Sequence, residues 1–442
     1  MKDILERIIM DGWERGWPDG VPRKAVVREH EGKISVVLGM RRVGKTWLCF
    51  QKMRELEEDG ISRRRMLYVN FEDERLLPFS AEHFQSLLDV YFRLCPEATE
   101  SAYYLFLDEP QRIPGWELFL RRVLDEGRAR LFVTGSSAKM LGREIATALR
   151  GRALSTELYP LRFGEYLRFH EVAWSGKKAY STRDRAVLSD ALSGYLACGG
   201  FPEVQGADNG AIQRDILRGY VDVVILRDVI ERHKVANVAA LRALIRQVFQ
   251  SPGALFSVNK FYNQLRSMGV PCTKNTLYEF LNQLADAYLL YPVELRTRSA
   301  KQRQVNPRKV YVADTGLIQA YSMGMTGDHG AMLENAVFME LKSRGLSVDY
   351  VVTKSGFEVD FLAGEEQGVP ELIQVCWSLD RPETADREFR AITEALDEGL
   401  AERGAVICFD SGNVKSPDPR VAVVSAFCWF LEGAGQIGEK GA

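Results

Sequence analysis

Residues 39–46 read GMRRVGKT, which is a complete G-x-x-x-x-G-K-[ST] phosphate-binding loop. A short apolar run, 34–38, precedes the loop, and a run that can continue as a helix, 47–53, follows it. This strand–loop–helix context is the setting that the motif requires. We therefore expect the backbone N–H groups of the loop and the N-terminus of the next helix to cradle a phosphate group.

Each residue of this loop has an expected role. Gly39 and Gly44 let the backbone curl, Lys45 is predicted to reach the β- and γ-phosphates of a nucleotide, and Thr46 is predicted to bind Mg²⁺. A glycine-rich turn without a ligand is the alternative, and the next motif argues against it. The residues expected to contact the nucleotide are Gly39, Met40, Arg41, Arg42, Val43, Gly44, Lys45, Thr46 and Trp47.

A second motif lies downstream of the loop. The apolar run 104–107 leads into Asp108 and Glu109, a pattern typical of a Walker B strand. Asp108, at the carboxyl end of this strand, is predicted to hold the Mg²⁺ shell, and Glu109 is predicted to polarise the attacking water. The second pattern alone is common, but paired with the phosphate-binding loop it predicts a site that uses ATP and Mg²⁺.

Polar residues near the ends of other predicted strands are candidates for the same site. Ser136 is expected to sense the γ-phosphate, and the alternative is a serine turn that caps the following helix. Arg150 and Arg152 are candidates for an arginine finger, in cis or from a neighbouring subunit, and the alternative is a basic surface turn. Glu72 and Asp73 are expected to face the site or to cap the next segment, and a solvated turn is the favoured interpretation.

Apolar runs alternate with helical patterns in the first part of the chain. Four runs besides the one before the loop suit strands of a parallel sheet, at 66–71, 104–107, 131–134 and 154–158. Residues 116–126 have apolar side chains at helical spacing. Alternating strands and helices predict the α/β class, with right-handed crossovers and helices on both faces of the sheet, as in a P-loop NTPase.

Several further segments give the chain a family resemblance. It resembles prokaryotic AAA+-type P-loop ATPases that carry a C-terminal domain of uncharacterised function, over roughly residues 20 to 430. In such a family Gly199, Gly200 and Pro202 are expected near the adenine side of a helical lid. Besides the loop, the segments that carry the resemblance are YVNFED (68–73), LFLDEP (105–110), TGSSA (134–138), LRGR (149–152), GGFPE (199–203), NPRKVYVADTGL (306–317), LEN (333–335), EVDF (358–361) and LIQVC (372–376).

The resemblance and the patterns together predict four parts. The first is the P-loop AAA+-like core, the second a helical lid, the third a winged helix-turn-helix, and the fourth a restriction-endonuclease-like α/β domain that is expected to be inactive. Their expected ranges are 1–160, 161–235, 236–310 and 311–442.

The third part is predicted from two short helices, the second of which begins near Thr273, followed by strand-like runs. This pattern predicts a recognition helix and a basic wing that contact DNA phosphates. The alternative is a protein-binding winged helix with ordinary basic protection of an edge strand. The DNA-binding candidates are Lys274, Asn275 and Tyr278 on the helix and Arg296, Arg298, Lys301 and Arg303 in the wing, which extends to Arg308 and Lys309.

The fourth part resembles the PD-(D/E)xK nuclease fold. Glu334 or Glu340 on a helix, Asp360 in a strand and Gln374 in the next strand are the candidates for its metal site. The third motif lacks its lysine, because Cys376 stands where an ammonium is needed. We therefore expect a vestigial site that is retained for binding, and the alternative is that these acids simply end strands in water.

Composition limits the partners. The chain has 442 residues, 58 Lys and Arg against 60 Asp and Glu, and seven cysteines with no C-x-x-C pair. These values predict a cytoplasmic protein with free thiols and no membrane span. We expect an ATPase that uses MgATP to switch a C-terminal region that binds DNA or a protein, with the oligomeric state open. The alternatives are an ATP-regulated metal-dependent nuclease and a nucleotide-bound interaction module without turnover.

Overall fold

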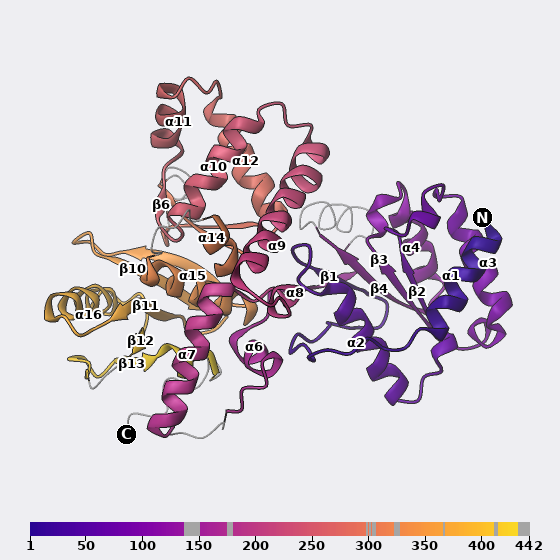
Figure 1. The fold of residues 1–442 in the computed structure, drawn as a ribbon, viewed down its shortest axis with the longest axis horizontal. Coiled ribbons are helices and arrows are strands. Elements are labelled where there is room, and N and C mark those ends of the chain that lie inside the picture. Colours follow the sequence, from indigo (N-terminus) through magenta and orange to yellow (C-terminus); the bar gives the residue numbers. More distant parts are fainter. Residues whose placement is uncertain are drawn as a thin grey trace. The chain divides into compact units, whose positions relative to one another are not determined.

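The computed structural model describes residues 1–136, 151–174, 180–297, 299, 302, 306–321, 328–365, 367–410 and 414–431. The chain folds into two compact units (Figure 1). The first consists of residues 1–158 and 286–288, and the second of residues 159–285 and 289–442. The division into core, lid, winged helix and nuclease-like domain stays a prediction.

The first unit is built on a parallel five-stranded sheet with the strand order β2-β3-β4-β1-β5. All five residues of β1 are buried, so both faces of the sheet are covered, as is usual for parallel sheets. β4 lies between β1 and β3, so the carboxyl ends of β1 and β3 flank the carboxyl end of β4. The strands are β1 (Ile34–Leu38), β2 (Met66–Asn70), β3 (Tyr103–Asp108), β4 (Ala129–Gly135) and β5 (Ala153–Glu157).

Helices of the first unit follow the strands as the alternating pattern predicted. The helix after the loop, α2, begins at Lys45 with Gly44 as its N-cap. In the sheet, Phe106 of β3 stacks on Phe132 of β4 with ring centroids 4.4 Å apart. The helices are α1 (Lys2–Glu14), α2 (Lys45–Glu58), α3 (His83–Leu94) and α4 (Trp116–Asp125), with short 3₁₀ turns at η1 (Arg63–Arg65), η2 (Glu74–Leu76), η3 (Pro96–Thr99) and η4 (Pro110–Arg112).

The second unit contains a mixed sheet with the order β13-β12-β11-β10-β9. The first three of these strands pair in parallel and the last three pair antiparallel. The elements of this part are α15 (His329–Ser343), β9 (Ser347–Val352), β10 (Glu358–Gly364), β11 (Glu371–Ser378), α16 (Pro382–Asp397), β12 (Gly404–Asp410), β13 (Val421–Ser425) and α17 (Ala426–Leu431).

Helices from the predicted lid share a hydrophobic core with this mixed sheet. Phe163 of α6 and Leu192 of α7 belong to the same buried cluster as Phe338 of α15, Phe361 of β10 and Phe427 of α17. These segments therefore fold as one unit. The helices are α6 (Phe163–Phe169), α7 (Thr182–Cys198), α8 (Pro202–Gln205) and α9 (Gly210–Val223), and α9 continues into a π-helical stretch, η5 (Val224–Glu231).

Four described helices and a small antiparallel sheet lie between these parts of the second unit in the sequence. The turn between the second and third helices contains Gly269 at φ +73°, and the sheet has the order β6-β8-β7. The elements are α10 (Val238–Gln250), β6 (Leu255–Phe256), α11 (Val258–Ser267), α12 (Lys274–Asp286), β7 (Leu290–Val293), β8 (Arg308–Val312) and α14 (Thr315–Tyr321).

The GGFPE and ADTGL segments meet inside the second unit. The carboxylate of Asp314 accepts hydrogen bonds from the backbone N–H of Gly200 (2.7 Å) and of Gly316 (2.9 Å), and burial raises the pKa of this carboxyl to about 7. Gly199 has φ +76°, and a Cβ at this position would lie 1.7 Å from Asp314 Oδ1. The close approach of Asp314 thus explains the glycine. The expected adenine role stays a prediction.

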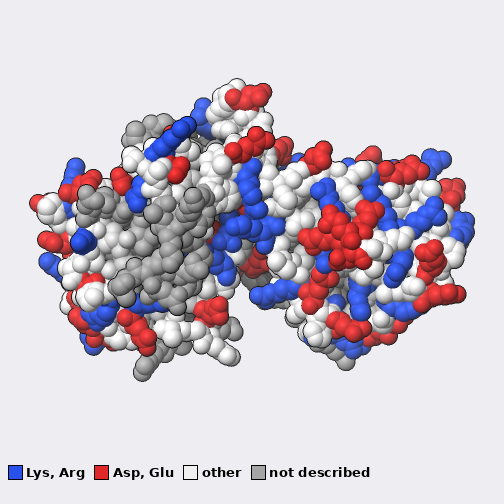
Figure 2. Space-filling model, turned by 90° about the horizontal axis from the view of Figure 1, so that it is seen from below, with Lys and Arg blue, Asp and Glu red and all other residues white. Residues whose placement is uncertain are grey.

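The described surface carries both signs of charge. Figure 2 shows Lys and Arg interspersed with Asp and Glu over the visible face of each unit, as the net charge of −2 leads one to expect. Among the described helices, none has the length and apolar character needed to cross a lipid bilayer.

Candidate functional site

The phosphate-binding loop has the curled backbone that its motif predicts. Gly39, Arg42 and Gly44 have φ values of +150°, +68° and +97°. A Cβ at position 39 would lie 2.3 Å from the carbonyl oxygen of Leu158, so a side chain cannot be placed there. The loop leads directly into the N-terminus of α2, where unpaired backbone N–H groups favour an anion.

The segment before β1 supports the loop, a role that the sequence did not predict. Arg23 is buried, and its Nη1 donates to the carbonyl of Val43 at 2.6 Å. Gln51 of α2 pairs with the backbone of Arg23 in both directions, at 2.8 and 3.2 Å. Trp47 packs against Gly20, where a Cβ would lie 2.8 Å from the indole. These contacts tie the segment before β1 to the loop and to α2.

Lys45 belongs to the loop, and its side chain folds back onto the first residues of the loop. Its Nζ donates to the carbonyls of Gly39 (3.0 Å) and Met40 (3.1 Å) and lies 3.7 Å from Oε1 of Glu109. The side chain is only 7% exposed, so solvent screens its charge less than it would screen an ammonium in bulk water. The ammonium is thus positioned where the loop's backbone converges.

Asp108 is held by three hydroxyl groups. Thr46 Oγ1 (2.7 Å) and Tyr68 OH (2.8 Å) donate to its Oδ2, and Thr134 Oγ1 donates to its Oδ1. Burial raises the pKa of Tyr68, and Asp108 raises it further, so the phenol keeps its proton and remains a donor. Tyr68, on β2, is a site residue that the sequence analysis missed, although it lies in the YVNFED segment.

These groups fit Mg²⁺ and a nucleoside triphosphate. Thr46 and Asp108 present a hydroxyl and a carboxylate whose oxygens are 2.7 Å apart, and hard oxygen donors of this kind are the ones that Mg²⁺ prefers. The loop adjoining them supplies backbone N–H groups and the ammonium of Lys45 for phosphate oxygens. The predicted phosphate and metal residues are therefore brought together at one edge of the sheet.

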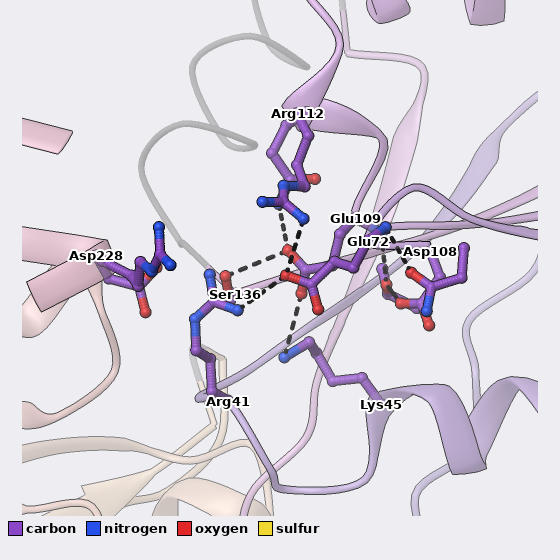
Figure 3. A network of polar contacts seen from close by, with 12 residues as sticks. Arg41, Lys45, Glu72, Asp108, Glu109, Arg112, Ser136 and Asp228 are labelled. Atoms are coloured by element: carbon purple, nitrogen blue, oxygen red, sulfur yellow. Dashed lines mark hydrogen bonds and ion pairs between the residues drawn. The ribbon is translucent and has the colours of Figure 1, made fainter. Parts of the chain in front are cut away.

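Glu109 is buried beside Lys45 in a left-handed backbone conformation with φ +54°. Its Oε2 accepts hydrogen bonds from Ser136 Oγ (3.3 Å) and from Gln111 Nε2 (Figure 3). The Oε1 of Gln111 is buried and has no hydrogen-bond partner among the described residues. Ser136 thus contacts the predicted water-polarising acid, and Gln111 is a second residue that sequence reasoning missed.

Glu72 faces the site and Asp73 does not. Glu72 Oε1 lies 3.2 Å from Nη1 of Arg41, in the loop, and 3.6 Å from Nη1 of Arg112, in η4 (Figure 3). Asp73 instead caps η2, where it accepts from the backbone N–H of Arg75. Glu72 thus lies in an exposed turn, as the favoured interpretation predicted, but its carboxylate also contacts the phosphate-binding loop.

Arg152 lies at the wrong edge of the sheet for a finger in cis. Its carbonyl accepts from the backbone N–H of Ile34, the first residue of β1, whereas the phosphate-binding loop follows the last residue of that strand. Its guanidinium pairs with Asp125. A residue that precedes a parallel strand lies at the amino edge, so the expected cis role of Arg152 is corrected. Arg150 lies outside the described residues.

The second unit contains a separate polar cluster that lines a cavity of about 970 Å³. Lys309 of β8 is 2% exposed, and its Nζ lies 2.9 Å from Glu334, 2.8 Å from Glu358 and 2.8 Å from Asp360. Burial tends to lower the pKa of Lys309, but the three carboxylates outweigh it and raise the pKa. Lys309 is therefore an internal cation and not part of a basic surface wing.

The other predicted nuclease residues divide into two groups. Gln374 lines the same cavity, where its Oε1 accepts from the backbone N–H of Asp360 (3.2 Å) and its Nε2 donates to Glu388 (2.6 Å). Glu340 instead pairs with Arg162 and, at 2.9 Å, with Arg344. Of the two acids on α15, the structure thus brings Glu334 to the cluster and excludes Glu340. The described residues contain no group of three side chains that could hold a metal ion.

The predicted DNA-binding residues lie in exposed or partly neutralised positions. Lys274, Asn275 and Tyr278 are exposed on the first turns of α12. Arg296 is 3.3 Å from Asp349, so part of the basic charge predicted for the wing is compensated by an acid from another strand. The remaining wing candidates, Arg298, Lys301 and Arg303, lie outside the described residues.

Comparisons with known proteins agree with the first unit. Residues 31–167 match the family model described as an AAA domain, and residues 189–327 match a domain of unknown function (DUF8612). The uncharacterized protein MJ1544 of Methanocaldococcus jannaschii is 34% identical over 406 residues, which cover 89% of this chain and 86% of that protein. An uncharacterized protein of Haemophilus influenzae is 32% identical over 353 residues, which cover 79% and 83%.

Among solved structures, the Aeropyrum pernix ORC1 protein in complex with DNA is similar over 73% of this chain and 92% of its own, with 15% identity and a TM-score of 0.29. This score is too low to indicate a shared overall arrangement. The fold of the first unit therefore rests on its own strand order and on the AAA domain match.

Replacing Lys309 by methionine should destabilise the second unit by roughly 3 kcal/mol or more near neutral pH, because three carboxylates would lose their buried counter-ion. Burial, with repulsion from Asp360, already raises the pKa of Glu334. In the variant the pKa of Glu334 should rise further above its unfolded value. Stability should then be retained at low pH and lost as pH rises. Chemical denaturation at about pH 5 and about pH 8 measures this.

The matched control is Lys354→Met, which removes an exposed ammonium from the turn between β9 and β10. This variant should unfold like the unmodified protein at both pH values. Equal stability of Lys309→Met and Lys354→Met would contradict the role of Lys309 as the cation of the cluster.

Proposed function

The chain belongs to the family of the Methanocaldococcus jannaschii protein MJ1544, and we propose that its first unit binds MgATP and hydrolyses it to ADP and phosphate. The observation that carries this proposal is a convergence of side chains from separate strands. Lys45 and Thr46 follow β1, whereas Asp108 and Glu109 end β3, and they contact one another at the carboxyl edge of the sheet. Ligands of parallel α/β sheets bind at this edge.

Each residue then has a separate task in the proposed reaction. Lys45 neutralises phosphate charge, and Thr46 and Asp108 offer oxygens to the metal. Mg²⁺, held by Thr46 and Asp108, would offset the negative charge that develops on the phosphate oxygens. Glu109 orients the water that attacks the γ-phosphorus and accepts its proton as the bond to ADP breaks. Ser136 holds Glu109 in place through its hydroxyl, at 3.3 Å.

Two substitutions should separate binding from hydrolysis. Lys45→Ala should lose both, because the cation that meets the phosphates is removed. Glu109→Gln should still bind ATP but turn it over at least about 100-fold more slowly, because an amide cannot accept the proton. Binding is measured with a fluorescent ATP analogue, and turnover by phosphate release.

The matched control for these variants is Lys52→Ala, on the same helix as Lys45, where the ammonium pairs with Glu29. Its activity should equal that of the unmodified protein. Full turnover by Glu109→Gln would remove Glu109 from its role. Identical behaviour of Lys45→Ala and the unmodified protein would refute the proposal, and stable nucleotide binding without any turnover would favour an interaction module.

We further propose that the nucleotide cycle switches a binding region in the second unit. The order α10-β6-α11-α12-β7-β8, with a short turn between α11 and α12, supports a winged helix-turn-helix. Lys274, Asn275 and Tyr278 are exposed early on α12, where groove contacts occur in such domains. Because Arg296 is already paired with Asp349, the face of α12 carries the proposal more than the wing does.

DNA binding should be salt-dependent and should change ATP turnover. Binding to duplex DNA and ATP hydrolysis with and without DNA are measured between about 50 and 200 mM salt. Lys274→Ala should weaken binding and lower the slope of log K against log salt by about one if it meets a phosphate. Arg403→Ala, which removes a guanidinium near Glu371, is the control. A chain that shows no salt-dependent DNA binding would point to a protein partner.

A metal-dependent nuclease is the second candidate function, and one observation favours it. Glu334, Asp360 and Gln374 line a single cavity, and Lys309 supplies from β8 the ammonium that Cys376 cannot provide. However, this ammonium contacts both Glu334 and Asp360, the acids that a metal would need. The cluster is therefore better suited to internal ion pairing than to metal chemistry.

We accordingly expect no cleavage of single- or double-stranded DNA in Mg²⁺ or Mn²⁺. Cleavage is measured on gels with the unmodified protein, Asp360→Ala and Glu365→Ala, which removes an exposed acid just after β10. Cleavage that disappears in Asp360→Ala and persists in Glu365→Ala would contradict this expectation and establish the nuclease.

A further inference from the structure

The proposed hydrolysis needs a cation, and Arg152, one of the two predicted fingers, does not supply it in cis. Charge develops on the γ-phosphate oxygens in the transition state, and P-loop enzymes commonly meet it with a guanidinium. Arg152 lies at the opposite edge of the sheet and is paired with Asp125. The described part of the first unit offers two other guanidiniums near Glu109, those of Arg41 and Arg112.

These two arginines converge on one oxygen atom. Arg41 belongs to the phosphate-binding loop, and Arg112 ends the short turn η4 that begins directly after Glu109. Their Nη1 atoms lie 3.2 and 3.6 Å from Oε1 of Glu72, which follows β2 (Figure 3). A carboxylate thus occupies the point at which both guanidiniums meet.

The side chains that these contacts join carry both signs of charge. Lys45, Arg41 and Arg112 are positive, and Glu72, Asp108 and Glu109 are negative. MgATP adds net negative charge, so its entry is favoured if a carboxylate gives up its cations. Glu72 is suited to do so, because its side chain is 40% exposed and ion pairs at such exposure are weak. Guanidiniums bind phosphate oxygens in a strong bidentate geometry.

We propose that Arg112 is a catalytic residue that contacts the γ-phosphate in cis. Arg41 then binds the phosphates in the ground state. Glu72 is a positioning residue that holds both guanidiniums until MgATP enters. This inference rests on the proposed hydrolysis. In the reaction the bond between the γ-phosphorus and the bridging oxygen of ADP breaks while the bond to water forms, and Arg112 offsets the charge on the γ-phosphate oxygens. Arg112 exchanges no proton.

Three variants should change different kinetic constants of ATP hydrolysis. Arg112→Gln should lower kcat at least about 100-fold with KM changed less than about 3-fold, since it acts on the transition state. Arg41→Gln should mainly raise KM. Glu72→Gln should lower KM by up to about 5-fold, because it removes the anion that competes with phosphate. Arg122→Gln, an ion-paired arginine on α4, should match the unmodified protein.

A mixing experiment separates a cis from a trans arginine. Lys45→Ala and Arg112→Gln proteins are each inactive by expectation, and their mixture should stay inactive if Arg112 serves its own site. Recovery of activity on mixing would overturn the inference, as would unchanged kcat in Arg112→Gln while the unmodified protein hydrolyses ATP. An unmodified protein that binds ATP without hydrolysis would instead refute the proposed function.

Discussion

The carboxylate of Asp108 makes the contacts on which the proposed nucleotide site of the first unit depends. It ends β3 and accepts hydrogen bonds from Thr46 at the start of α2, Tyr68 of β2 and Thr134 of β4. These segments become neighbours only through the strand order β2-β3-β4-β1. Hydroxyl donors on three sides fix the orientation of the carboxylate in advance. Such preorganisation is what makes a charged group effective in catalysis, because no reorganisation is left to the reaction.

In the second unit, a fixed cation and not a set of neutral hydroxyls neutralises the buried acids. Glu334, Glu358 and Asp360 surround the ammonium of Lys309, a cation that is covalently part of β8 and cannot leave. A metal ion can replace the neutral hydroxyls around Asp108 at small electrostatic cost. Removal of the buried ammonium of Lys309 would instead leave three carboxylates without a counter-ion. The first site is therefore suited to a ligand that comes and goes. The second is suited to a permanent ion-pair cluster.

The parts predicted correctly from the sequence were those whose signal is local. The phosphate-binding loop, the acids at the end of β3 and the parallel sheet follow from contiguous residues, and the observed strands differ from the predicted runs only at their ends. Tyr68 was missed, and the contacts of Glu72 with Arg41 and Arg112 were not predicted, because the partners of both residues are distant in sequence. Arg152 could have been excluded from topology alone, since a residue before a parallel strand lies at the edge opposite the loop.

Lys309 illustrates why a run of like charges is a poor guide to a surface. The segment Arg308–Val312 is a strand, so its side chains alternate between two faces. Lys309 and Tyr311 share one face and both reach Glu334, at 2.9 and 2.6 Å, while Arg308 pairs with Glu294. One residue of the basic run thus completes a buried cluster, and its neighbour stays near solvent. The ammonium absent from the Gln374–Cys376 motif is present in space but comes from a strand that no motif pattern of β11 could reveal.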